Sequence, residues 1–358
     1  MGNGLKDITV VVTAAGAPGA PPIMKSLRLN GERKIEIVGT DMNPDAVGLF
    51  MAERGHVVPG GTDPEFVPTM LELAEKERAD VILPLATYEL MPFSENVQRF
   101  EEIGVKVPVS KPEALTIAND KGLLCDFVRE RGLPAPESVM VSSFKEFELA
   151  VEKLGHPEVP VCFKPRIGKG SRGFRVLDPS VDRFDLLMNH KPTHTVTTLD
   201  EISPVLSGAD PFPELVVMEY LPGTEYSVDL LLSGGEALAV LPRPREVTKL
   251  GISFMGRIEK DPEIEELASK IAREIGLEYN INMQFKRSGD GVPKIIEINP
   301  RVSGTIVMCT GAGVNLPYLG VKLALGEEIP PIEPKYGTRM IRYWGEIFVD
   351  KDGHPYSL

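Results

Sequence analysis

The first third of the chain alternates between short apolar runs and longer amphipathic segments. Three runs are rich in β-branched residues, ITVVVTAAG, KIEIVGTD and DVILPLA, and segments of helical length such as residues 64–78 separate them. Short apolar strands that alternate with helices predict a parallel sheet covered on both faces. Ligands of such sheets bind beyond the carboxyl ends of the strands. The residues at these ends are Gly16 to Gly19, Asp41 with Asn43, and Thr87, Tyr88 and Glu89.

The glycines after the first strand invite comparison with a dinucleotide-binding loop. That fingerprint requires G-x-G-x-x-G followed by an acidic residue, whereas this stretch reads G-A-P-G-A-P, with Asp41 at the end of the next strand. A tight strand-to-helix turn in a doubly wound sheet is the better interpretation.

The pattern changes after residue 111. A helix is predicted from the start signal at Asn119 and Asp120 to the stop at Gly132. A strand, VPVCFKP, then leads into RIGKGSRGFRVL, where three glycines lie beside Lys169 and Arg172. Glycines expose backbone N–H groups to a phosphate, and the cations add attraction. The tip of a flexible hairpin explains the glycines equally well.

Polar residues line one face of a later strand, KIIEINPR. Period two places Glu297 and Asn299 on one face and the isoleucines on the other, and Arg301 joins the polar face if the chain stays extended. The preceding strand, YNINMQFKR, carries Gln284. If the two strands pair across the SGDGVP turn, Gln284 lies near Glu297 and Asn299. Such oxygen ligands suit Mg²⁺, which takes its remaining ligands from water and substrate phosphates.

Composition and charge exclude several classes of protein. A chain of 358 residues, 42% hydrophobic and 25% charged, can bury a large core in two or three units. The net charge of −13 argues against nucleic-acid and anionic-membrane partners. Three widely spaced cysteines, and the absence of a signal-peptide pattern or a long apolar run, predict a reducing, cytoplasmic location.

Histidine and cysteine offer little further chemistry. His190 and His194 have the i, i+4 spacing of a zinc pair, but Pro192 between them breaks a helix. Cys162 lies in an apolar strand and is predicted to be a small buried hydrophobe.

Arginines are the candidates for binding a substrate carboxylate. Arg243 and Arg245, in LPRPREV, present guanidinium groups that suit carboxylates, although two solvated arginines in a proline-rich loop are an equal alternative. Trp344 is predicted to pack late in a strand, and the alternating Arg339 and Arg342 could border a substrate.

These features together resemble the ATP-grasp superfamily, and most of all its carbamoyl-phosphate-synthetase-like branch. The resemblance rests on Lys121, Lys164, the Gly168 to Gly173 loop, MEYLPGTEYSVD, Gln284 and EINPRVSG. It implies an α/β and α+β fold, in which a parallel-sheet pre-ATP-grasp domain at residues 1–110 precedes a two-lobed ATP-grasp domain at 111–330. The lid lobe is expected at about 137–215, the hinge at about 219–221 and the metal-binding lobe at about 222–330, with a C-terminal strand region at 331–358 packing on the core.

The resemblance also implies a nucleotide site. Lys121 and Lys164 are expected to lie against the phosphates of ATP, and Lys164 also near the adenine. Glu225 is expected to bind the ribose hydroxyls. Backbone groups of the hinge, Glu219, Tyr220 and Leu221, are expected to meet the adenine edge. The lid over the phosphates comprises Gly168, Lys169, Gly170, Ser171, Arg172 and Gly173.

In the same resemblance Gln284, Glu297 and Asn299 hold Mg²⁺, with Mn²⁺ as an alternative, and Arg301 contacts the phosphoryl group or an acyl phosphate. Lys164 and Arg301 are therefore the residues expected to act in catalysis.

The departures from this family concern the acceptor. The chain is a single unit without an internal repeat, which argues against synthesis of carbamoyl phosphate by this chain alone. Arg172 occupies a lid position where small residues are common, and Ser253 stands where the synthetase has a histidine. The acceptor site is therefore open, and its candidates are Thr87, Glu89, Arg243, Arg245 and Ser253.

Three functions remain open. The first is a ligase that activates a carboxylate as an acyl phosphate and joins it to an amine, with Mg-ATP held between two lobes. The second is an ATP-dependent carboxylating enzyme that activates bicarbonate, and the third is a non-catalytic ATP sensor. Small-molecule carboxylates and amines are the expected partners, and a homodimer is left open.

Overall fold

The computed structural model describes residues 5–168, 172–190, 195–249 and 251–356. The chain divides into two compact units. Unit 1 comprises residues 1–116, 226–284 and 298–358, and unit 2 comprises residues 117–225 and 285–297. The predicted domain bounds remain a prediction.

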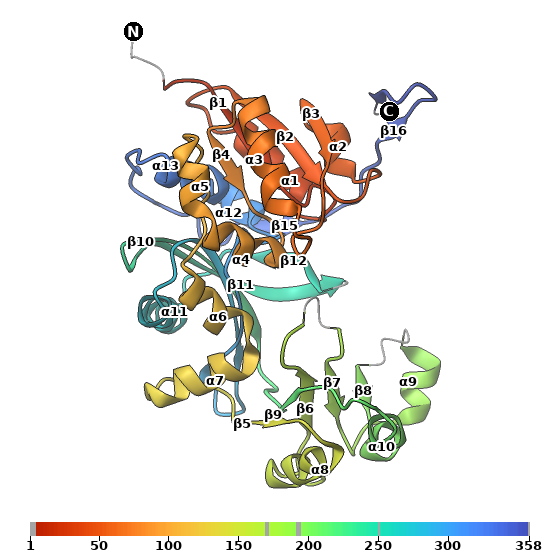
Figure 1. The fold of residues 1–358 in the computed structure, drawn as a ribbon. Coiled ribbons are helices and arrows are strands. Elements are labelled where there is room, and N and C mark those ends of the chain that lie inside the picture. Colours follow the sequence, from red (N-terminus) through yellow and green to blue (C-terminus); the bar gives the residue numbers. More distant parts are fainter. Residues whose placement is uncertain (1–4, 169–171, 191–194, 250, 357–358) are drawn as a thin grey trace. The chain divides into compact units, whose positions relative to one another are not determined.

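A four-stranded parallel sheet opens unit 1, in the order β3-β2-β1-β4 (Figure 1). Its strands are β1 (Ile8–Val12), β2 (Ile35–Asp41), β3 (Arg54–Val57) and β4 (Val81–Leu83). This confirms the predicted parallel sheet. Strand β3 was not predicted, because its sequence RGHV lacks an apolar run.

Helices cover both faces of this sheet. Val10 and Val12 of β1 pack in one core cluster with Ile23 of α1, while Val11 packs in another with Phe93. A strand buried on both faces explains the continuous β-branched run in the sequence. The helices of this part are α1 (Ala20–Arg28), α2 (Val47–Met51), α3 (Phe66–Glu77), α4 (Thr87–Glu95), α5 (Val97–Glu102) and α6 (Pro112–Asn119).

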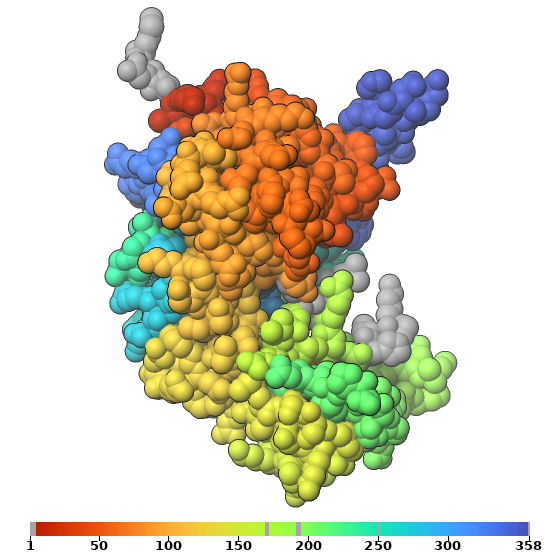
Figure 2. Space-filling model, in the orientation of Figure 1, coloured from red at the N-terminus to blue at the C-terminus, as the bar shows by residue number. Residues whose placement is uncertain are grey.

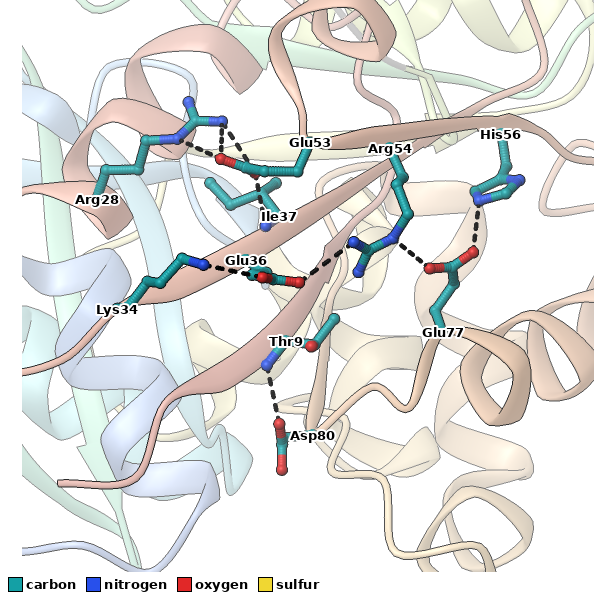
Figure 3. Close-up of polar contacts among 10 residues, drawn as sticks. All are labelled: Thr9, Arg28, Lys34, Glu36, Ile37, Glu53, Arg54, His56, Glu77 and Asp80. Carbon is teal, nitrogen blue, oxygen red and sulfur yellow. Dashed lines mark hydrogen bonds and ion pairs between the residues drawn. The ribbon is translucent and has the colours of Figure 1, made fainter.

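Charged side chains of this layer form ion pairs with one another (Figure 3). Arg54 of β3 contacts Glu36 of β2 at 3.2 Å and Glu77 of α3 at 2.5 Å. Glu77 also contacts His56 at 2.9 Å. These ion pairs connect two strands and a helix at the edge of the sheet.

A second, six-stranded sheet has the order β14-β13-β10-β11-β12-β15. Leu231, Ala239 and Leu241 of its central strands pack in the same core cluster as Val10 of β1 and Met308. Within unit 1 the parallel sheet therefore shares a core with this sheet. The strands are β10 (Glu225–Ser233), β11 (Glu236–Lys249), β12 (Ile252–Arg257), β13 (Tyr279–Arg287), β14 (Pro293–Asn299) and β15 (Arg339–Ile341).

Three helices accompany the second sheet, namely α11 (Pro262–Ile275), α12 (Val307–Gly311) and α13 (Leu316–Ala324). Helix α11 begins after Asp261, whose side chain accepts from Ile264 N, and ends before Gly276, which lies in the left-handed region.

Unit 2 is built on a five-stranded sheet of order β5-β9-β6-β7-β8. Phe147, Phe163 and Val217 lie in its core. Helix α7 begins at the predicted place, because Asp120 accepts hydrogen bonds from Gly122 N and Leu123 N. The elements are β5 (Ser138–Val141), β6 (Val161–Pro165), β7 (Arg175–Leu177), β8 (Val196–Thr197), β9 (Leu215–Glu219), α7 (Lys121–Glu130), α8 (Phe144–Lys153), α9 (Arg183–Asn189) and α10 (Leu199–Ser207).

The last described residues of unit 1 form a small hairpin of β16 (Phe348–Val349) and β17 (Pro355–Tyr356). In Figure 2 these residues, coloured blue, protrude beside the parallel-sheet layer. Trp344 lies between β15 and this hairpin, and its side chain is 65% exposed. The prediction that Trp344 packs within a strand is therefore wrong, because the strand ends at Ile341.

Candidate active site

Lys121, Lys164 and Glu297 of unit 2 lie close enough for their charges to interact. Lys121, the first residue of α7, donates from Nζ to Gly168 O at 2.7 Å, and Lys164 of β6 donates to Ile296 O at 2.9 Å. Burial lowers the pKa of Lys121, and the neighbouring Lys164 charge acts in the same direction, whereas Glu297 opposes the shift. The structure thus brings together the predicted phosphate-binding lysines and the predicted metal ligand Glu297. Their roles remain predictions.

The predicted lid falls partly outside the described residues, since these exclude Lys169, Gly170 and Ser171. Gly168 is held through its carbonyl by Lys121. Arg172 is exposed, and Gly173 has a φ of 75°, which favours glycine.

The hinge residues lie at the end of β9. The Glu219 carboxylate accepts from Glu137 N at 2.8 Å and from Lys294 Nζ at 2.6 Å, so this side chain is engaged within unit 2. Tyr220 lies 4.9 Å from Lys286 Nζ in a cation–π contact, and Leu221 is buried. Glu225 begins β10. An engaged Glu219 side chain is compatible with the expected use of backbone groups here. Lys294 was not predicted.

The predicted metal ligands lie on neighbouring strands of one sheet. Gln284 is on β13, and Glu297 and Asn299 are on β14, so the predicted pairing of these strands is confirmed. Among the described residues no group of three or more His, Cys, Asp and Glu side chains could hold a metal. The role of Gln284, Glu297 and Asn299 as metal ligands remains a prediction.

Arg301 follows a tight turn at the end of β14. Its backbone N–H donates to Asn299 O at 2.7 Å, and its Nη2 donates to Asn299 Oδ1 at 3.3 Å. Nη1 donates to Val302 O at 2.9 Å. The guanidinium group is thereby fixed beside a predicted metal ligand.

The loop alternative for Arg243 and Arg245 is wrong. Both residues lie on β11, and Arg243 is only 1% exposed. Its Nε donates to Asp229 Oδ2 at 2.7 Å, which makes a buried ion pair. Arg245 donates from Nη2 to Gly251 O at 2.6 Å.

The remaining acceptor candidates lie in different parts of unit 1. Ser253 is buried on β12. Thr87 begins α4, and the buried Glu89 carboxylate accepts from Thr13 Oγ1 at 2.5 Å. Glu89 therefore connects the end of β1 to the first turn of α4. No described contact joins these residues to Arg243.

The glycine turn after β1 is stabilised locally. Asp41 Oδ2 accepts from Gly16 N at 2.7 Å, and Ala17 N donates to Ala14 O at 2.9 Å. The turn interpretation is therefore confirmed, because Asp41 supports the turn itself. Of the zinc alternative, His194 lies outside the described residues.

The three cysteines are free and buried. Burial raises the pKa of Cys162 to about 11 and also raises the pKa of Cys125 and of Cys309. Cys162 is thus the buried hydrophobe that its strand predicts. Among the described residues, no helix is both long and apolar enough to span a bilayer.

Comparisons with known proteins identify relatives of two parts of the chain. Residues 211–343 match the family described as ATP-grasp in the biosynthetic pathway with Ter operon, and residues 22–108 match the PylC-like N-terminal domain. A carbamoyl-phosphate synthase of Methanobrevibacter smithii is 24% identical over 312 residues, which are 83% of this chain and 76% of that protein. The carbamoyl phosphate synthase large chain of Clostridium acetobutylicum is 22% identical over 74% of this chain, which spans only 24% of that large chain.

A solved structure has the same fold. The biotin carboxylase domain dimer of Hydrogenobacter thermophilus 2-oxoglutarate carboxylase, in complex with MgADP, ADP and bicarbonate, superposes with a TM-score of 0.65 at 18% identity. The match covers 91% of this chain and 71% of that chain. The predicted resemblance and fold class are confirmed. This chain contains an ATP-grasp domain, preceded by a PylC-like N-terminal domain.

Proposed function

We propose that this protein is an ATP-dependent ligase, which activates a carboxylate as an acyl phosphate and joins it to an amine. The observation that carries the proposal is the convergence of Lys121, Lys164 and Glu297 within unit 2. The family match supports ATP as the nucleotide.

The lysines are suited to phosphates because their charges are not neutralised by a direct ion pair among the described residues. Lys121 and Lys164 each donate to a backbone carbonyl, which leaves further N–H donors on each ammonium group. We propose that these donors neutralise the phosphates of ATP and align them. Such preorganised charge supplies most of the protein's contribution to phosphoryl transfer.

We propose that Gln284, Glu297 and Asn299 hold Mg²⁺, with Mn²⁺ as an alternative, and that this cation screens phosphate charge when it is bound. Arg301, fixed against Asn299, then contacts the transferred phosphoryl group. The γ-phosphoryl moves to a carboxylate oxygen and ADP leaves. The amine nitrogen next attacks the acyl carbon, phosphate leaves, and the nitrogen loses a proton.

The test is phosphate release from Mg-ATP by the purified full chain, with added carboxylic acids and amines in pairs. We expect release that requires both an acid and an amine and is unaffected by bicarbonate. Tight nucleotide binding without phosphate release in any combination would contradict a ligase and favour the ATP sensor.

The similar biotin carboxylase domain, whose solved structure holds bicarbonate, favours a second candidate, in which bicarbonate is the activated acid. Phosphate release that depends on bicarbonate and needs no organic acid would establish this alternative. The two candidates share the nucleotide site, so the dependence on the acid distinguishes them.

We propose small molecules as the only substrates, a cytoplasmic location, and a homodimer as the simplest assembly. The net charge of −13 and the buried thiols support the first two. Light scattering after size-exclusion chromatography tests the assembly, and a mass near 39.2 kDa would exclude a dimer.

A further inference from the structure

Polar residues gather at one end of a face of the second sheet in unit 1. Ser227 of β10 lies opposite Arg243 of β11, so both side chains share a face with Asp229. Arg243 Nη2 donates to Ser227 Oγ and to Ser303 Oγ, each at 3.2 Å. Asn282 Nδ2 donates to Asp229 Oδ1 at 2.8 Å. We call Ser227, Asp229, Arg243, Asn282 and Ser303 the Arg243 cluster.

The Arg243 cluster lacks one acceptor. The Asp229 carboxylate accepts from Arg243, from Asn282 and from Cys309 Sγ, so it is fully engaged. Arg243 Nη1 is buried and has no hydrogen-bond partner among the described residues. A buried N–H donor without a partner destabilises the folded chain, and such donors in proteins normally meet a bound molecule or water.

A second guanidinium group lies beside this donor. Arg342 Nη2 donates to Gly304 O at 3.0 Å, and Nη1 donates to Pro18 O at 3.4 Å. Its Nε is buried, and it too has no partner among the described residues. Because Ser303 and Gly304 are consecutive, Arg243 and Arg342 flank one short segment of chain.

The two arginines produce an excess of positive charge. Burial lowers the pKa of Arg342, and the charge of Arg243 lowers it further, which shows that the two cations are close enough to repel. Within the described part of the chain, Arg342 contacts carbonyl oxygens and no carboxylate. Asp229 thus compensates only one of the two charges, so an anion fits here.

An apolar surface adjoins Arg342 and is open to solvent. Met255 lies opposite Ile341, and Arg342 N donates to Phe254 O at 2.9 Å, so the side chains of Phe254 and Arg342 share a face. The ring of Trp344 lies 5.9 Å from that of Phe254, centroid to centroid. Lys249 Nζ lies 4.0 Å from the centroid of the Phe254 ring, so a further cation lies beside these two rings.

The backbone at Gly19 closely approaches the segment between the arginines. A Cβ at Gly19 would lie 2.4 Å from Gly304 Cα, so a side chain there would force this segment to shift. The carbonyl of Pro18, which accepts from Arg342, is held in the same approach. The donors are therefore preorganised, which lowers the entropic cost of binding a ligand.

We propose that Arg342 Nε and Arg243 Nη1 bind the carboxylate of a small substrate whose apolar part lies on Phe254 and Trp344. Two N–H donors from guanidinium groups match the two oxygens of one carboxylate. The substrate class is an apolar amino acid or a short monocarboxylic acid. Only the assignment of this ligand to a ligase reaction rests on the proposed function.

The test measures thermal stabilisation of the full chain by the twenty standard L-amino acids and by acetate, propionate and isovalerate, each with MgADP present. The C-terminal amide or the simple amide of each stabilising acid is the paired probe. We expect at least one acid to stabilise the protein and its amide to have no effect.

Arg342→Gln should raise the apparent Kd of that acid by about tenfold or more, because it removes a charge-assisted contact. The matched control is Arg339→Gln, an exposed arginine at the start of β15, and it should bind the acid as the parent does. Both variants should keep the MgADP response, which shows that they are folded.

Three results would overturn the subsite. In the first, no acid stabilises the parent. In the second, an acid and its amide stabilise it equally. In the third, the Kd is unchanged in Arg342→Gln, which would leave water as the partner of the two donors. Each can occur with a normal MgADP response, so the failure of the subsite is distinct from that of the proposed function. Loss of the MgADP response in the parent would contradict the nucleotide site instead.

A trapping reaction identifies which carboxylate is bound. With ATP and hydroxylamine, a hydroxamate of the stabilising acid shows that the subsite holds the acid that is activated. Amine-dependent phosphate release without this hydroxamate shows that it holds the carboxylate of the amine-bearing substrate.

Discussion

The two units hold cationic side chains in different ways. In unit 1, Arg243 is paired with Asp229 and fixed by two hydroxyl groups. In unit 2, Lys121 and Lys164 each donate to a single backbone carbonyl. A carboxylate neutralises a charge, whereas a carbonyl only orients it. The first arrangement therefore stabilises and positions the chain, while the second keeps positive charge available for a phosphate.

The largest effect should come from breaking the buried pair of unit 1. Arg243→Met leaves Asp229 charged and buried without its partner, which should lower the free energy of unfolding by about 3–5 kcal/mol. Urea denaturation measures this loss. Arg243→Met combined with Asp229→Asn should recover part of it, because the second change removes the unpaired charge. A double variant as unstable as the sum of the two single variants would contradict direct pairing.

In unit 2, Glu297→Gln should impair catalysis and leave folding intact. The amide keeps the shape of the side chain but removes the charge that the proposed cation requires, so kcat for phosphate release should fall at least about a hundredfold. The melting temperature should not fall, because no buried ion pair is broken. Glu266→Gln, on the exposed face of α11, is the control. A destabilised but fully active Glu297→Gln enzyme would contradict the metal assignment.

In unit 1, the backbone packing at Gly19 leaves no room for an added Cβ. Gly19→Ala places a Cβ 2.4 Å from Gly304 Cα, so the backbone has to move, and we expect a loss of about 1–3 kcal/mol in the free energy of unfolding. Gly311→Ala is the control, since its added Cβ would meet no atom within 4 Å. Equal stability of the two variants would show that the segment at Gly304 yields easily.

The smallest effect concerns the exposed ion pairs of the first sheet. Burial raises the pKa of Glu77, but Arg54 and His56 outweigh it, and the net pKa lies below the usual 4.5. A lowered pKa in the folded state stabilises the protein above that usual pKa, and the contribution disappears as the pH falls through the folded value. Because these side chains are partly exposed, we expect at most about 1 kcal/mol.

The measurement is the free energy of unfolding of Glu77→Gln and of the parent between pH 3 and pH 7. The difference between the two should be present at neutral pH and vanish in acid. Glu75→Gln, exposed on the same helix, should follow the parent throughout. A difference that grows in acid would reverse the assigned direction.

The sequence predicted the elements whose signals are local. The strands of the parallel sheet other than β3 have continuous apolar runs, and α7 begins after Asp120, which accepts hydrogen bonds from the first turn. Strand β3 has neither signal. The family resemblance placed Lys121 and Lys164, because their positions follow from the order of motifs along the chain.

The Arg243 cluster was missed because its members come from four separate segments. Prolines at 242 and 244 favoured a loop, since proline is rare in central strands, yet β11 includes both and has register shifts shortly after them. Ser227 and Asp229 are two residues apart on β10, so they share a face. Only the register between β10 and β11 shows that this face is opposite Arg243.

Trp344 gives the molecule an intrinsic optical reporter. It is the only tryptophan of the 358 residues, so indole emission from the full chain comes from one position, beside Phe254. An exposed indole emits at longer wavelength than a shielded one, and any ligand that covers it should shift the spectrum towards the blue. Occupancy of this end of unit 1 can therefore be followed by light alone, without a label and without turnover.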